Sequence, residues 1–233
     1  STNTYLKELS LENAIADNTV VYAENQRQGK GQHGAIWVSE PGKNLTFSIL
    51  KNFKSLPVAK KVWVNCLVSL AVAEVLEEMA VPDIKVKWPN DIMSGNHKVC
   101  GILIENVVQG KQLKKAIIGI GLNVNQTDFP QLPHASSLCL LMGKHIPLMP
   151  LLLNLSKHIC EKISNLNAFS WEQLKGSYEK MLYRKDLPSA FEDESGLRFM
   201  GMIRTIAANG NLQLELEDGT RKNYDLKEIK LLS

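Results

Sequence analysis

What the sequence lacks narrows the range of functions open to it. Only four of its 233 residues are cysteine, none forms a Cys-x-x-Cys pair, and the histidines show no ligand spacing, which argues against structural zinc and for reduced thiols. No apolar run reaches the roughly 18 residues that a membrane helix needs, and the polar N-terminus is not a signal peptide. A net charge of +3 gives no support for a nucleic-acid or membrane partner. We therefore expect a cytoplasmic protein that binds neither nucleic acid nor a membrane.

Enough of the chain is apolar to build a sizeable core. Hydrophobic residues make up 44% and charged residues 22% of the sequence, which suits one globular domain followed by a small second one. Apolar periodicity and turn residues predict helices over 1–15, 57–79, 148–166 and 171–182, and strands over 19–23, 44–50, 85–88, 99–108 and 113–124. Because the strands do not alternate with helices as βαβ units, we predict an α+β fold whose central sheet is mixed or antiparallel and packed with helices.

Short strands and turns replace the long helices beyond residue 184. Asn209-Gly210 and Asp218-Gly219 are dipeptides typical of hairpin turns. The strands predicted around them cover residues 198–207, 212–216, 222–225 and 227–231. We therefore predict a first, larger domain over residues 1–184 and a small SH3-like β-barrel over residues 185–233.

The glycine-rich segment of residues 24–37 reads E-N-Q-R-Q-G-K-G-Q-H-G-A-I-W. Its glycines allow a ligand to approach the backbone closely, and Arg27 and Lys30 add positive charge, which together favour an anion site. The spacing G-x-G-x-x-G formally matches a dinucleotide fingerprint, but a short β-like segment ending in Pro-Gly follows instead of a helix, and the P-loop pattern is absent. The segment by itself is compatible with a phosphate-binding loop and with a mobile surface loop.

Three further motifs follow this segment along the chain. Residues 87–91 read K-W-P-N-D, residues 98–105 read K-V-C-G-I-L-I-E, and residues 119–125 read G-I-G-L-N-V-N. In this order, and with S-T-N at the N-terminus, they resemble the biotin protein ligases over nearly the whole chain. K-W-P-N-D followed by K-x-x-G-I-L is the most specific part of the resemblance. The chain looks like the monofunctional type, without the N-terminal DNA-binding domain that some members carry.

The resemblance implies a two-step biotin–[acetyl-CoA-carboxylase] ligase reaction. Biotin's carboxylate attacks the α-phosphate of ATP, which gives biotinyl-5′-AMP and pyrophosphate, and a lysine of a biotin carboxyl carrier domain then attacks the adenylate. Because the first step brings two anions together, it needs fixed positive charge and Mg²⁺. Two alternatives stay open, namely a lipoate–protein ligase, which shares the fold, and a non-catalytic biotin or nucleotide sensor. Homodimers occur in the family, so a homodimer is compatible with the resemblance.

Residue by residue, the resemblance also implies a site. The lysines expected to be catalytic are Lys98, which would contact biotin's carboxylate and the reacting oxygens, and Lys30. Residues expected to bind biotin are Ser1, Thr2, Asn3, Gln26, Lys30, Gly31, Gln32 and Lys98. Residues expected to bind ATP or the adenylate are Gly29, Lys30, Trp37, Asn90, Gly119, Gly121 and Asn123, of which Asn123 would read the adenine edge.

Several residues of this expected site also have a structural alternative. The position of Lys98 just after a turn is by itself typical of a solvent-exposed lysine, and only the flanking motif favours a place in the binding site. Asp91 is the candidate Mg²⁺ ligand, although an Asn-Asp pair after proline is also typical of a plain turn. Lys87 is compatible with a structural role or with a phosphate contact, and Trp37 with a wall of the site or with the core.

Overall fold

The computed structural model describes residues 1–12, 14–130 and 132–232. Its central element is a six-stranded sheet with the order β1-β4-β8-β7-β6-β5, in which all neighbouring strands are antiparallel. The strands are β1 (Val20–Ala23), β4 (Leu45–Pro57), β5 (Ile84–Lys87), β6 (Asp91–Ser94), β7 (His97–Gln109) and β8 (Gln112–Leu122). The predicted α+β class and its antiparallel central sheet are confirmed.

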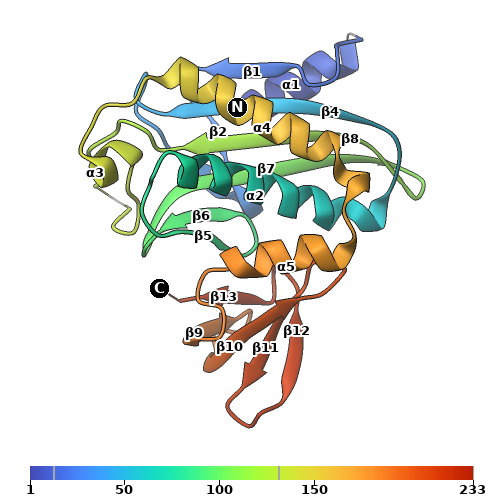
Figure 1. The fold of residues 1–233 in the computed structure, drawn as a ribbon, viewed down its shortest axis with the longest axis vertical. Coiled ribbons are helices and arrows are strands. Elements are labelled where there is room, and N and C mark those ends of the chain that lie inside the picture. The colour runs from blue at the N-terminus through green and yellow to red at the C-terminus, as the bar shows by residue number, and fades with distance from the viewer. Residues whose placement is uncertain (13, 131, 233) are drawn as a thin grey trace.

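The helices cover the two faces of this sheet differently. They are α1 (Thr2–Glu12), α2 (Lys61–Glu78), α3 (Leu138–Met142), α4 (Leu148–Ser164) and α5 (Trp171–Met181). Figure 1 shows α2 and α4 in front of the sheet and α5 below it. Side chains alternate along β4, so Ile49 joins the core that includes α2, whereas Leu50 packs with Leu6 of α1. The helix α1 therefore lies on the opposite face. Within the described part of the chain, no helix is both long and apolar enough to cross a membrane.

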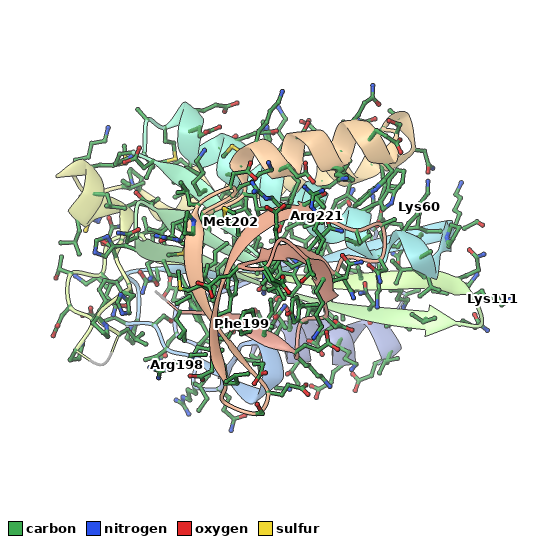
Figure 2. The ribbon with its side chains drawn as sticks, turned by 90° about the horizontal axis from the view of Figure 1, so that it is seen from below. Lys60, Lys111, Arg198, Phe199, Met202 and Arg221 are labelled. Carbon is green, nitrogen blue, oxygen red and sulfur yellow. The ribbon has the colours of Figure 1, made fainter. Side chains whose placement is uncertain are left out.

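The C-terminal residues form a second, smaller sheet. Its strands are β9 (Pro188–Asp193), β10 (Arg198–Ile206), β11 (Leu212–Leu216), β12 (Arg221–Tyr224) and β13 (Ile229–Leu231), in the antiparallel order β12-β11-β10-β9-β13. Figure 2 views this sheet from below, with Phe199 and Met202 on β10 and Arg221 on β12. A small C-terminal β domain is therefore present, while its closure into an SH3-like barrel and the boundary between residues 184 and 185 stay predictions.

The predicted elements differ from the observed ones mainly at their ends. Pro57 ends β4 instead of beginning a helix, because pairing with β8 extends the strand and a short 3-10 turn (Val58–Lys60) precedes α2. The strands β6 and β9 were not predicted, since each is short and begins at residues typical of turns. The first helix ends at Glu12 rather than at residue 15, and Asn13 lies outside the described residues.

Polar contacts join the two domains beside the K-W-P-N-D segment. The indole nitrogen of Trp88 donates a hydrogen bond to the carbonyl of Gly210 at 3.0 Å. The Thr205 hydroxyl of β10 also bonds the Glu179 carboxylate of α5. The C-terminal domain therefore contacts the first domain at this motif and at α5.

Candidate active site

A cavity of about 770 Å³ lies between the N-terminus, the glycine-rich segment and the C-terminal domain. Its size is typical of a small-molecule site, for which about 300–1,000 Å³ is usual. The floor of the cavity consists of β7 and β8 on the face that α1 partly covers. Gly101 pairs with Gly121 across these two strands, and Gly119 faces the same side two residues earlier. Without side chains at these positions the floor is hollow.

Each of these glycines allows one particular side chain to lie on the floor. A Cβ at Gly119 would be 2.4 Å from the Asn3 side-chain oxygen, and a Cβ at Gly121 would be 2.4 Å from the ring of Trp37. A Cβ at Gly101 would be 3.0 Å from the same ring. The sequence predicted that Gly119 and Gly121 admit a ligand, whereas in the structure they first admit Asn3 and Trp37.

At one end of the cavity, the polar end, Thr2, Asn3 and Gln26 form the lining, and Ser48 bonds two of them without lining the cavity itself. The backbone N–H of Thr2 donates to Gln26 Oε1 at 2.9 Å. The Ser48 hydroxyl lies 2.7 Å from Thr2 Oγ1 and 2.6 Å from Asn3 Oδ1. Asn3 in turn donates to Glu105 Oε2 at 2.9 Å. These uncharged groups are therefore oriented by one another before any ligand binds.

The other end, the charged end, consists of Lys87, Asp91, Lys98 and Lys230. The Lys98 ammonium lies 2.8 Å from Asp91 Oδ1 and 5.7 Å from the centre of the Trp37 ring. Burial lowers the pKa of Lys87, Asp91 raises it, and the nearby charges of Lys98 and Lys230 lower it further. An anion bound among these three lysines would relieve their mutual repulsion, so the charged end is suited to a phosphate or carboxylate.

The glycine-rich segment folds as a small hairpin over the floor. Its strands β2 (Gly29–Lys30) and β3 (Ile36–Trp37) pair across a 3-10 turn at Gln32–Gly34, and the N–H of Gly31 donates to the carbonyl of Ala35 at 2.7 Å. No helix follows the segment, as predicted. The hairpin sets Trp37 on the floor, where its indole nitrogen is buried without a hydrogen-bond partner among the described residues.

Most of the predicted site residues come together in this cavity. Those that line it are Ser1, Thr2, Asn3, Gln26, Lys30, Gly31, Gln32, Trp37, Asn90, Asp91, Lys98, Gly119 and Gly121. Gly29 and Asn123 are not among the described residues that line the cavity. Gly29 packs under the backbone of Trp37, and the buried Asn123 side chain donates to the carbonyl of Ser136 at 3.1 Å. The adenine contact of Asn123 stays a prediction that the cavity does not support.

Three residues of the site were missed by the sequence analysis. Ser48 and Glu105 support the polar end, and Lys230 belongs to the charged end. A signal existed for Ser48, because it alternates with Phe47 and Ile49 on β4 and so faces away from the core. No signal existed for Lys230, since its approach depends on how the C-terminal domain packs.

A metal ion would have few protein ligands here. Among the described residues, no group of three or more His, Cys, Asp or Glu side chains could hold one. Asp91 is nevertheless a carboxylate in the cavity. Since Mg²⁺ at nucleotide sites is bound by one or two carboxylates together with phosphate oxygens, Asp91 fits a Mg²⁺ that arrives with a nucleotide.

Sequence comparisons identify relatives over somewhat more than half of the chain. The model of the biotin/lipoate A/B protein ligase family matches residues 1–123. The bifunctional ligase/repressor BirA of Bacillus subtilis (strain 168) is 36% identical over 132 residues, which are 56% of this chain and 40% of that protein. The biotin–[acetyl-CoA-carboxylase] ligase of Mycobacterium tuberculosis (strain ATCC 25618 / H37Rv) is 34% identical over 141 residues, which are 59% of this chain and 51% of that protein. The chain thus matches about half or less of the length of these relatives.

Comparison of structures extends the similarity to the whole chain. The biotin protein ligase from Aquifex aeolicus in complex with biotin and ATP superposes with a TM-score of 0.80 and 28% identity, over 100% of this chain and 94% of that one. The apo structure of the Aquifex aeolicus enzyme gives a TM-score of 0.76 at 26% identity. The chain therefore belongs to the biotin/lipoate A/B protein ligase family, to which the similar biotin protein ligases named above point as well.

Proposed function

We propose that the protein is an ATP-dependent biotin–protein ligase, which converts biotin to biotinyl-5′-AMP with release of pyrophosphate and transfers it to a lysine of a biotin carboxyl carrier domain. The observation that carries the proposal is the order of groups along one floor. Asn3 lies over Gly119, Trp37 over Gly121 and Gly101, and Lys98 beside Gly101. A ligand lying on this floor would place a neutral polar ring at one end and an anionic group at the other.

The polar end favours biotin over lipoate. Biotin's ureido ring carries two N–H donors and one carbonyl acceptor, which can pair with the amide and hydroxyl groups of Thr2, Asn3 and Gln26. Lipoate carries a dithiolane ring there, which has no such donors or acceptors. Bound lipoate would leave unpaired the donors and acceptors that these residues do not use among themselves, and an unpaired buried group costs about 1–3 kcal/mol.

The charged end suits the first chemical step. Biotin's carboxylate and the α-phosphate repel each other as they meet, and the Lys98 ammonium, held by Asp91 at 2.8 Å, offers a fixed positive charge to both. Lys87 and Lys230 add charge for the remaining phosphates. Mg²⁺, held by Asp91 and phosphate oxygens, would add positive charge at the reacting phosphate.

The second step needs no nucleophile from the enzyme. The acceptor lysine, as the free amine, attacks the carbonyl carbon of biotinyl-adenylate. An amide bond forms as the nitrogen loses a proton to water, and AMP leaves with the electrons of the broken anhydride bond. Lys30 is exposed at the edge of the cavity and can contact the phosphate of AMP as it departs.

The proposal is tested by incubating the protein with MgATP and either biotin or lipoate, and then with a biotin carboxyl carrier domain. We expect pyrophosphate release that depends on biotin, and mass addition to one carrier lysine. Release with lipoate alone would instead assign a lipoate–protein ligase. Biotin binding without pyrophosphate release would assign a non-catalytic sensor.

A further inference from the structure

Two side chains outside the cavity converge on the backbone of the segment Lys87–Asp91. The carbonyl oxygen of Pro89 accepts a hydrogen bond from Asn65 Nδ2 at 2.8 Å and another from the Tyr178 hydroxyl at 3.3 Å. Asn65 is on α2 and Tyr178 is on α5, so two helices from different parts of the chain donate to one oxygen. A carbonyl oxygen has two lone pairs and can accept both bonds at once.

Tyr178 is suited to donate permanently. It is one of the largest fully buried side chains, with 1% of its surface exposed. Burial raises the pKa of its hydroxyl well above the usual value. The hydroxyl therefore stays protonated over the working pH range and remains a hydrogen-bond donor to the Pro89 carbonyl.

The Pro89 carbonyl lies directly before the residues that face the cavity. The next residue, Asn90, accepts a hydrogen bond from the N–H of Ile102 at 3.0 Å through its backbone carbonyl, and its side chain donates to the carbonyl of Ile102. Asp91 follows and pairs with Lys98. The segment is thus held by the helices on one side and by β7 on the other, with the Asp91 carboxylate at its end.

We infer that Asn65 and Tyr178 are positioning residues, which jointly hold the Pro89 carbonyl and thereby set Asp91 and its partner Lys98 for adenylate formation. The inference rests on the proposed ligase activity for its kinetic consequence. Either donor alone satisfies the carbonyl, so the loss of one is tolerated. Loss of both leaves a carbonyl without a partner in the protein interior, which favours a shifted segment.

The test uses Asn65→Ala, Tyr178→Phe and the double variant in the full chain, with biotin-dependent pyrophosphate release as the readout. We expect each single variant to keep kcat within about tenfold of the natural protein. The double variant should lose about 100-fold in kcat, because a displacement of about 1 Å at a reacting group has this effect. Its loss should exceed the product of the two single losses, while biotin affinity without ATP stays unchanged.

Two matched controls separate positioning from a general loss of packing. Ser69→Ala removes a buried hydroxyl one turn further along α2 that has no hydrogen-bond partner among the described residues. Tyr183→Phe removes a tyrosine hydroxyl that bonds Asn96 at 2.7 Å, away from the segment. Both should keep kcat. A double variant that loses thermal stability but keeps kcat, or whose loss only equals the product of the single losses, would overturn the inference.

A measurement that does not depend on activity separates the positioning role of Asn65 and Tyr178 from the proposed ligase function. The amide hydrogen of Ile102 is bonded to Asn90, so its exchange with solvent reports whether the segment is held. We expect the amide of Ile102 to exchange faster in the double variant, and at the normal rate in the two single variants. If the natural protein formed no adenylate, the proposed function would be wrong, and unchanged exchange in the double variant would overturn the positioning role independently.

Discussion

The two ends of the cavity keep polar groups inside the protein in opposite ways. At the polar end Thr2, Asn3 and Ser48 are buried and uncharged, and they are hydrogen-bonded to each other or to Gln26. At the charged end the side chains of Lys98 and Asp91 keep 37% and 26% of their surface exposed. Neutral polar groups can be buried when they are hydrogen-bonded, whereas burying a charge costs much more hydration free energy.

The two ends also differ in where their residues come from. The polar end is made by residues of the first fifty positions, on α1, β4 and the loop before β2. The charged end collects lysines from β5, β7 and β13, and so depends on the C-terminal domain. We therefore expect changes at the polar end to act on biotin affinity, and changes at the charged end to act on the adenylation rate.

The largest effect is expected from Lys98→Ala. Losing a charge that acts in the transition state lowers the rate of pyrophosphate release by about 10²–10³. The Lys98–Asp91 pair is partly exposed, so unfolding by heat should change by less than about 1 kcal/mol. Lys157→Ala, which removes an exposed lysine of α4, serves as the control. Near-normal pyrophosphate release by the Lys98 variant would contradict its catalytic role.

Alanine at the floor glycines should separate the two ends most clearly. Overpacking costs about 1–3 kcal/mol. Gly119→Ala displaces Asn3 and should weaken biotin binding by up to about 100-fold. Gly121→Ala displaces Trp37 and should lower kcat more than biotin affinity.

Titration calorimetry with biotin, followed by adenylation kinetics, measures both effects. Gly176→Ala on α5 is the control, because a Cβ there meets no atom within 4 Å and should not disturb either end. Identical effects of the two floor variants would mean that the ends do not act separately.

A smaller effect is expected from Ser48→Ala. The change removes the hydroxyl that lies between Thr2 Oγ1 and Asn3 Oδ1. Leaving the Asn3 oxygen without this donor should raise KM for biotin about tenfold without changing kcat. Thr46→Val on the same face of β4 is the control, since the Thr46 hydroxyl bonds only the carbonyl of Ala23 at 2.8 Å. Steady-state kinetics at saturating ATP measure this, and a change in kcat instead of KM would assign Ser48 to the chemical step.

The smallest effect concerns Lys87→Met and its pH dependence. Burial lowers the pKa of Lys87 in the folded protein. Below that folded pKa the charged lysine destabilises the folded state, and this destabilisation disappears as the pH rises towards the ordinary lysine pKa of about 10.4. The variant should therefore be slightly more stable at neutral pH, by less than about 1 kcal/mol, with a gap that closes at higher pH. Its affinity for ATP should fall. Thermal unfolding between pH 7 and 10 checks the sign, and a variant that is less stable at pH 7 would contradict it.

Much of the floor could be predicted because it follows from local alternation. In I-I-G-I-G-L the alternate residues Ile118, Ile120 and Leu122 face the main core. Gly119 and Gly121 therefore face the other side of β8, where Ile117 packs against α1. Lys98 was predicted in the site from its motif, and it lines the cavity. Asn123 lies just beyond the same strand, yet its backbone N–H and carbonyl pair with Val99 and Leu138 and its side chain turns to Ser136, which no local pattern indicates.

The sequence by itself determined which residues face each side of a strand, where turns interrupt the strands and which family motifs occur, because these are properties of a few neighbouring residues. Only the tertiary structure decided that Ser48 meets Asn3, that Lys230 joins Lys87, and that Asn65 and Tyr178 share the Pro89 carbonyl. Each of these contacts joins residues far apart along the chain. They depend on strand order and on how α2, α5 and the C-terminal sheet pack together, which is settled by burial of the whole core rather than by local conformation.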